Sequence, residues 1–142
     1  MTDEKIRVLL VDDEPLALRG LKLRLETFSE VEIIGQSTNG REAVRDIKAL
    51  SPDLVFLDIQ MPGLDGFGVV RAMIGAPAPL FIFVTAYDKY AIEAFEANAL
   101  DYIVKPVEEE RLSDALHRAR EAIKNKVASK RESKLIEMLA SL

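Results

Sequence analysis

The chain has 142 residues, of which 49% are hydrophobic and 30% charged, a composition typical of one globular domain and not of a disordered chain. Its formal charge of −5 argues against nucleic acid as the main partner of this segment, and the absence of cysteine excludes disulfides and thiolate metal sites. No signal-peptide pattern precedes the first apolar run, and no run approaches the roughly 20 residues of a membrane span, so a cytoplasmic protein is expected.

Five short apolar runs predict β-strands, and five amphipathic stretches predict helices. The strands are expected at residues 6–11, 32–37, 54–57, 80–84 and 102–104. The helices are expected at residues 15–28, 40–50, 66–73, 89–97 and from about Glu108 onward. This alternation favours right-handed βαβ crossovers. The predicted fold class is α/β, a doubly wound, flavodoxin-like parallel sheet of five strands in the order 2-1-3-4-5 with helices on both faces.

The pattern changes after about Ile123. One acid, Glu132, stands there among five basic residues: Lys124, Lys126, Lys130, Arg131 and Lys134. No Gly or Pro interrupts the chain from Val107 onward, which favours one long helix. We expect a first domain at residues 1–123 and a helical extension at 124–142, which is either a solvated terminal helix or a linker or coiled-coil stub leading to a second domain.

Polar residues follow four of the predicted strands at the point where each strand ends. Asp12 and Asp13 follow the first strand, Asp58 the third, Thr85 the fourth and Lys105 the fifth. The carboxyl ends of parallel strands lie on one edge of the sheet, where ligands bind. Each residue alone has an ordinary reading as a helix cap, a loop residue or a solvated side chain, but the set together predicts one reactive crevice.

The three carboxylates suit magnesium and phosphate chemistry. A carboxylate such as Asp58 can attack phosphorus and form an acyl phosphate. Magnesium takes oxygen ligands in octahedral geometry, and Asp12, Asp13 and Asp58 are the candidate side-chain ligands, with the backbone carbonyl of Gln60 as a further one. Without a cation, three clustered carboxylates would repel one another, and the pKa of at least one would rise.

The remaining strand-end residues suit recognition of the phosphoryl group. Lys105 supplies a positive charge, and the Thr85 hydroxyl can donate a hydrogen bond. Ala86 is small and leaves room beside Thr85. Pro106 makes the Lys105–Pro106 bond a candidate cis peptide that would aim the lysine inward.

These residues stand in motifs that resemble the receiver domain of two-component response regulators. The motifs are V-L-L-V-D-D-E-P, L-V-F-L-D-I-Q-M-P-G-L-D-G, F-V-T-A and D-Y-I-V-K-P, within about residues 5–123. The resemblance implies that a sensor histidine kinase donates a phosphoryl group to Asp58, that the acids hold Mg²⁺, and that Thr85 and Lys105 sense the group. It also implies that Tyr102 is an aromatic switch, although an ordinary strand aromatic half covered by the last helix is the alternative.

The stretch T-A-Y-D-K-Y-A-I-E-A-F-E-A-N-A-L-D-Y is similar to regulators with a LytTR-type DNA-binding output domain. Such a domain is absent here, so DNA would be reached only through a part outside this chain, and a natural single-domain regulator is the other reading. The expected role is a phosphorylation-controlled switch for an output such as transcription. It is not a turnover enzyme, beyond its own Mg²⁺-dependent phosphotransfer and autodephosphorylation.

Three further residues receive hypotheses. Gln60 and Tyr87 flank the expected path of a hydrolytic water, and the bulk of Tyr87 would prolong the lifetime of the acyl phosphate. His117, the only histidine, is expected on the surface of the last helix.

A phosphoprotein of this kind is expected to form a homodimer through the fourth helix and its neighbours or through the long tail. No membrane partner is expected.

Three other classes of protein compete with this interpretation. An aspartyl-nucleophile phosphatase of the haloacid-dehalogenase type would carry a second acid two residues after the nucleophile, where this chain has Gln60. A nucleotide- or flavin-binding domain is disfavoured because no G-x-G-x-x-G or Walker A sequence is present. A receiver-like interaction module working without phosphorylation is the third alternative, and the intact acidic set argues against it.

Overall fold

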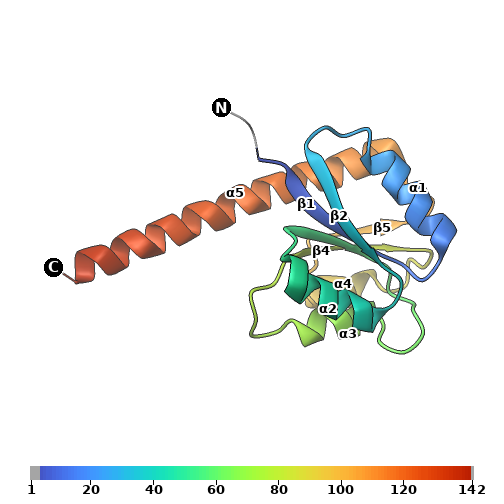
Figure 1. Cartoon of the computed structure of the whole chain (residues 1–142), viewed down its shortest axis with the longest axis horizontal. Helices are drawn as coiled ribbons and strands as arrows, with labels where there is room; N and C mark the ends of the chain where they lie inside the picture. The colour runs from blue at the N-terminus through green and yellow to red at the C-terminus, as the bar shows by residue number, and fades with distance from the viewer. Residues whose placement is uncertain (1–3, 142) are drawn as a thin grey trace.

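The computed structural model describes residues 4–141, and its strands form one parallel sheet of order β2-β1-β3-β4-β5 (Figure 1). The strands are β1 Ile6–Val11, β2 Val31–Ser37, β3 Leu54–Leu57, β4 Leu80–Thr85 and β5 Asp101–Val104. The helices are α1 Pro15–Leu25, α2 Gly40–Leu50, α3 Gly66–Ala72, α4 Ala91–Glu96 and α5 Glu109–Ala140. The predicted fold class and strand order are confirmed.

Helices cover both faces of the sheet, and the central strands are buried on both sides (Figure 1). Alternate residues of β1 show this: Val8 and Leu10 pack in the core beneath α1 and α5, while Leu9 and Val11 pack in the core beneath α2, α3 and α4. A strand with two buried faces needs an apolar residue at every position. The uninterrupted apolar runs of the sequence therefore identify the central strands.

Several boundaries differ from the predicted ones. Helix α1 ends at Leu25 instead of residue 28, and the Thr27 hydroxyl donates to the carbonyl of Arg24 at 2.8 Å, a local bond that competes with a further helical turn. Helix α4 spans Ala91–Glu96 instead of the predicted 89–97. Ala97 is its C-cap, and Asn98 beyond it has a positive φ of 62°, which does not continue a helix. The other differences are of one residue: β2 starts at 31, α3 ends at 72, β4 ends at 85, β5 starts at 101 and α5 starts at 109.

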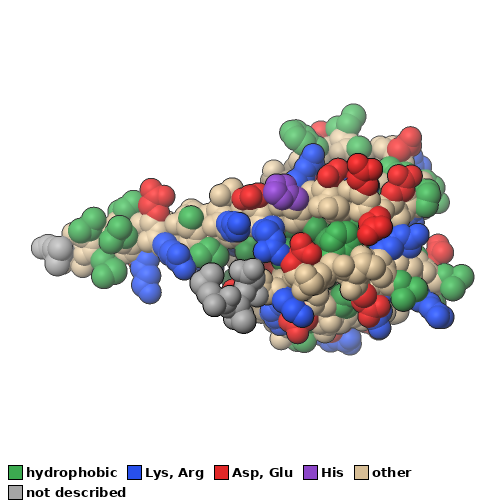
Figure 2. Space-filling view, turned by 90° about the horizontal axis from the view of Figure 1, so that it is seen from above, with side chains coloured by type: hydrophobic (Ala, Val, Ile, Leu, Met, Phe, Trp, Pro, Cys, Tyr) green, Lys and Arg blue, Asp and Glu red, His purple; other side chains and the backbone are tan. Residues whose placement is uncertain are grey.

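Helix α5 runs without a break through the predicted boundary at residue 123 and projects beyond the sheet (Figure 1). Its buried residues end at Ala119, and residues 124–141 are exposed. The projecting part carries Lys and Arg side chains first and hydrophobic side chains toward its end (Figure 2). The one long helix is confirmed, and the division into a domain and an extension stays a prediction.

The loop after β3 is packed so closely that two helices must begin with glycine. A Cβ on Gly66, the first residue of α3, would lie 2.5 Å from the carbonyl oxygen of Asp58. A Cβ on Gly40, the first residue of α2, would lie 2.1 Å from the carbonyl oxygen of Leu64. No other residue fits at such distances. These contacts fix the loop that follows Asp58.

Candidate functional site

The register of the sheet brings the strand-end residues together. Val11 is paired with Leu57, so Asp12 and Asp58 follow neighbouring positions, and the amide of Asp58 donates to the carbonyl of Val11 at 3.0 Å. On the other side Thr85 is paired with Val104, and the amide of Lys105 donates to the carbonyl of Thr85 at 2.8 Å. The pairing of Leu57 with Phe83 joins these two pairs of strands, so backbone pairing alone sets all four strand ends at one edge.

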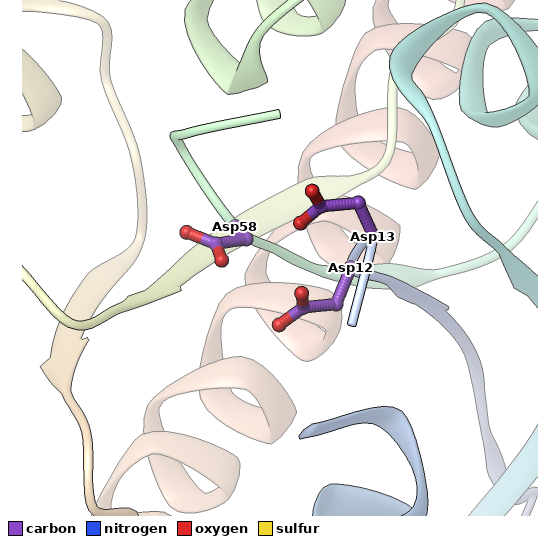
Figure 3. Close-up of side chains that lie close together, drawn as sticks. All are labelled: Asp12, Asp13 and Asp58. Atoms are coloured by element: carbon purple, nitrogen blue, oxygen red, sulfur yellow. The ribbon is translucent and has the colours of Figure 1, made fainter. Parts of the chain in front are cut away.

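Three carboxylates form one cluster at this edge. Oxygen atoms of Asp12, Asp13 and Asp58 all lie within 4.8 Å of one another, and Figure 3 shows the first two coming from the end of β1 and the third from the end of β3. Asp12 and Asp58 are 6% and 7% exposed, while Asp13 is more open. Oxygen donors at this spacing fit a hard divalent cation such as Mg²⁺. The predicted acidic cluster is thus present in the structure.

Lys105 lies across two of the acids. Its Nζ donates to Asp12 Oδ2 at 2.7 Å and to Asp58 Oδ2 at 3.2 Å. Burial by itself would lower the lysine pKa, but the hydrogen bond to Asp12 and the charges of both acids outweigh it and raise that pKa. The ammonium therefore stays charged and partly neutralises the cluster. The Lys105–Pro106 bond, for which the sequence left both the cis and the trans form open, is cis.

Asp58 is the acid that the crevice disfavours in its charged form. Burial raises its pKa most, and the charge of Asp12 raises it further. The charge and hydrogen bond of Lys105 and the hydroxyl of Thr85 act in the opposite direction but do not cancel the increase. A cation held between the carboxylates would relieve the same repulsion, so the donor set and the charge balance both fit a metal.

Asp12 also makes a local backbone contact, although it does not cap α1, whose N-cap residue is Glu14 and has no side-chain cap hydrogen bond. Asp12 Oδ1 accepts a hydrogen bond from the amide of Glu14 at 3.0 Å, just before α1 begins at Pro15. The other oxygen of the same carboxylate receives Lys105. One side chain therefore binds the backbone just before a helix and faces the crevice at once.

Thr85 and Ala86 form the wall of the crevice at the end of β4. Thr85 is fully buried, and its hydroxyl oxygen accepts from the amide of Tyr87 at 3.5 Å. Ala86 is exposed beside it. Tyr87 follows and is 43% exposed, so the predicted tuning residue of this loop lies at the surface.

Tyr102 links the last strand to the loop after β4. The residue is half-buried, its ring packs edge-on against Phe83 with centroids 6.5 Å apart, and its hydroxyl donates to the carbonyl of Tyr87. Burial raises the pKa of its phenol, and nearby charges that include Asp58 raise it further. The aromatic ring is thus placed between the sheet and the loop that carries Thr85.

Sequence reasoning missed two residues that the structure joins to the site or its strands. The first is Tyr90, whose hydroxyl accepts from Gln60 Nε2 at 2.6 Å. The second is Asp101, a buried acid bound by Arg111 at 2.6 and 2.9 Å. An acid at the head of an apolar strand was a usable signal for Asp101. Nothing in the spacing of Tyr90 and Gln60 indicated their contact.

His117 lies exposed on α5, as expected (Figure 2). None of the helices within residues 4–141 is both long enough and apolar enough to cross a membrane.

Comparisons with known proteins decide the family. The family model described as response regulator receiver domain matches residues 8–117. This chain belongs to the response regulator receiver family. Receiver domains bind Mg²⁺ at the acidic pocket that Asp12, Asp13 and Asp58 form here.

Relatives and solved structures agree with this assignment. The transcriptional regulatory protein BtsR of Salmonella typhi is 47% identical over 116 residues, which cover 82% of this chain and 48% of that protein. The sensory transduction protein LytT of Bacillus anthracis is 41% identical over 140 residues, covering 96% of this chain and 56% of that protein. The similarity to LytT bears out the resemblance to the LytTR-type group. The receiver chain spans about half the length of the curated relatives it matches.

Among solved structures, the response regulatory domain of mrkE from Klebsiella pneumoniae is similar with a TM-score of 0.77 and 35% identity, over 84% of this chain and 98% of that one. A CheX–CheY–BeF₃–Mg²⁺ complex from Borrelia burgdorferi is similar with a TM-score of 0.72 and 25% identity, over 80% of this chain and 87% of that one. The similarity therefore extends over most of the length of each of these two solved chains.

Proposed function

We propose that this receiver domain accepts a phosphoryl group on Asp58 from a sensor histidine kinase and passes the signal on as a change of conformation. The observation that carries the proposal is the convergence of Asp58 with two further acids and Lys105 in one crevice. Phosphoryl transfer needs an in-line nucleophile and charges that neutralise the transferring oxygens, and little covalent work from other groups. This crevice supplies both.

In the transfer, a carboxylate oxygen of Asp58 attacks phosphorus. The new O–P bond gives an acyl phosphate, and the P–N bond of the donor phosphohistidine breaks, which returns the electron pair to the imidazole. Mg²⁺, when bound by Asp12, Asp13, Asp58 and the Gln60 carbonyl, would supply positive charge to the phosphoryl oxygens.

The chain's own residues then hold the product. Lys105 is already within 3.2 Å of Asp58 and would pair with a phosphoryl oxygen. Thr85 would donate its hydroxyl to another oxygen, and small Ala86 leaves room beside it. Movement of Thr85 would vacate space for Tyr102, so that β5 and α4 rearrange together. Gln60 and Tyr87 would tune how long the acyl phosphate survives.

A bound stable analogue tests the proposal. The protein is incubated with Mg²⁺ and beryllofluoride, and amide exchange is measured against an Asp58→Ala control. We expect a Mg²⁺-dependent change in residues 85–105 that the control lacks. In a second arm the protein is phosphorylated by acetyl phosphate, and Tyr87→Ala should shorten the lifetime of the phosphoryl group. No change in the first arm would favour a receiver-like interaction module that works without phosphate.

A phosphatase remains the less favoured activity. Two residues after the nucleophile the structure places the amide of Gln60, which is bound to Tyr90 and cannot act as a general acid. Steady turnover of a phosphate ester by the purified protein would reverse this preference.

We infer that the signal leaves through a part of the protein outside this chain. BtsR is named a transcriptional regulatory protein and LytT a sensory transduction protein, and both are about twice as long as the matched region. The expected output is transcription, with DNA bound by that other part, in the cytoplasm. Residues 124–142 would be the linker, and a homodimer is the expected active form.

A further inference from the structure

A hydrogen bond joins the two loops that flank Asp58. Gln60 belongs to the loop after β3, and its side-chain Nε2 donates to the hydroxyl of Tyr90 at 2.6 Å. Tyr90 ends the loop after β4 and directly precedes the first residue of α4. The two partners are 30 residues apart in the chain, so this bond bridges separate segments.

The backbone of Gln60 lies at the edge of the crevice that holds Asp58. Its own backbone amide donates to Asp58 Oδ1 at 3.4 Å, so the residue cannot move far from the nucleophile. Its side chain is exposed and reaches away from that point to the loop after β4. The Gln60 side chain therefore bridges from a residue beside Asp58, which is only 7% exposed, to the loop after β4.

Tyr90 is held firmly enough to act as an anchor. Its ring packs edge-on against Phe67 of α3, with centroids 6.2 Å apart, and against Tyr87 at 6.2 Å. Lys89 Nζ lies 5.2 Å from the centroid of the same ring. These contacts involve the ring and not the hydroxyl, so loss of the hydroxyl alone should leave the ring in place.

We propose that Tyr90 is a positioning residue that holds the Gln60 side chain as a strap between the two loops and so limits the access of water to the acyl phosphate on Asp58. The inference rests on the proposed function, because it concerns the lifetime of the group that Asp58 would accept. An acyl phosphate is lost when water attacks phosphorus, the P–O bond to Asp58 breaks, and the carboxylate and inorganic phosphate separate. A strap across the approach slows that attack.

The test is a double-mutant cycle on the rate of phosphoryl loss. Wild type, Tyr90→Phe, Gln60→Ala and the double variant are phosphorylated with acetyl phosphate and Mg²⁺, the donor is removed, and the phosphorylated fraction is followed by intact mass. We expect Tyr90→Phe to lose the group about 2- to 10-fold faster, the range set by loss of one ordinary hydrogen bond. In the Gln60→Ala background the same change should have no further effect.

A second readout examines the bond directly. In the unphosphorylated protein, Tyr90→Phe should shift the side-chain amide resonances of Gln60 in a ¹⁵N spectrum. Glu96→Gln, a conservative change at an exposed position of α4, the helix that follows Tyr90, should alter neither these resonances nor the rate. Thermal unfolding of each variant shows whether the fold is retained.

The outcomes separate the two proposals. If wild type takes up no phosphoryl group while Mg²⁺ and donor are present, the function of Asp58 is wrong and the inference fails with it. If wild type is labelled but Tyr90→Phe keeps the wild-type rate, or gains the same increase with and without Gln60, only the role of Tyr90 is overturned.

Discussion

Asp101 is a buried acid that the fold keeps ionised. Its side chain is 6% exposed, and it receives Arg111 through two hydrogen bonds, with Arg118 at 3.4 Å. Burial alone would raise its pKa, but the bonds from Arg111 and the Tyr102 amide and the two guanidinium charges lower it below the usual value. The pair fastens the start of β5, next to Tyr102, to α5.

Replacement of this acid should destabilise the protein at neutral pH. Asp101→Asn is expected to lower the free energy of unfolding by roughly 1–3 kcal/mol, because Arg111 loses a charged acceptor. The folded-state pKa is depressed, so this stability is present above the unfolded pKa and is lost as pH falls through the folded one. Urea unfolding at several pH values should show a full difference at pH 7 that shrinks below about pH 4.

Arg118→Ala is the matched control for this prediction. The Arg118 side chain is 60% exposed, so its loss should cost less than about 1 kcal/mol. An unchanged stability of Asp101→Asn at pH 7, or a difference that grows in acid, would contradict the ion-pair interpretation.

At the scale of an element, the position of α3 depends on the absence of a Cβ atom at its first residue, Gly66. Gly66 lets the helix start against the carbonyl of Asp58, where an added Cβ would be 2.5 Å away, and 2.9 Å from Ile59 Cα. Both of these neighbours are backbone atoms, which cannot rotate away as the end of a flexible side chain can. The helix is therefore part of what fixes the nucleophile.

Gly66→Ala is expected to destabilise the fold by roughly 1–3 kcal/mol and to slow phosphorylation of Asp58, because the helix or the loop must move. Gly20→Ala is the control: its nearest neighbour is the flexible end of Arg24 at 3.2 Å, so helix propensity should raise stability by up to about 1 kcal/mol. Chemical unfolding and phosphorylation by acetyl phosphate measure both effects. Equal behaviour of the two variants would show that the close approach does not matter.

At the scale of the molecule, two apolar surfaces have no partner within the described chain. On α4, Ile92 is 74% and Phe95 83% exposed, while Ala94 alone is buried. On the projecting end of α5, four further apolar residues are more than half exposed: Leu135, Ile136, Met138 and Leu139. Both predicted routes to a homodimer are therefore open, through α4 or through the tail.

A pair of variants distinguishes the routes. With Mg²⁺ and beryllofluoride, wild type is expected to increase in mass by light scattering. Phe95→Asp should reduce that association with little change in monomer stability, because the side chain is exposed. If removal of residues 124–142 abolishes the association and Phe95→Asp does not, the tail carries the dimer. A wild type that stays monomeric would contradict the dimer altogether.

Much of the fold could be predicted because the buried central strands have a strong pattern in the sequence. Leu54 to Leu57 is apolar at every position, which only a strand buried on two faces requires, and the polar residue that follows each such run marks the functional edge. Short elements without such a pattern were placed less well. Helix α4 has one buried residue, so its boundaries depend on the turn before it and on Asn98 after it, and not on periodicity.

The sequence by itself determined the sheet, its order, the family and the set of residues at the strand ends, because these follow from local patterns and from motifs at fixed spacing. Only the tertiary structure decided which side chains of distant segments meet. The bond of Gln60 to Tyr90 and the pairing of Lys105 with Asp12 join residues 30 and 93 positions apart. The physical reason is that a hydrogen bond forms only when the donor–acceptor distance is right to within a few tenths of an ångström. The packing of the whole chain sets that distance, and no pattern along the sequence records it.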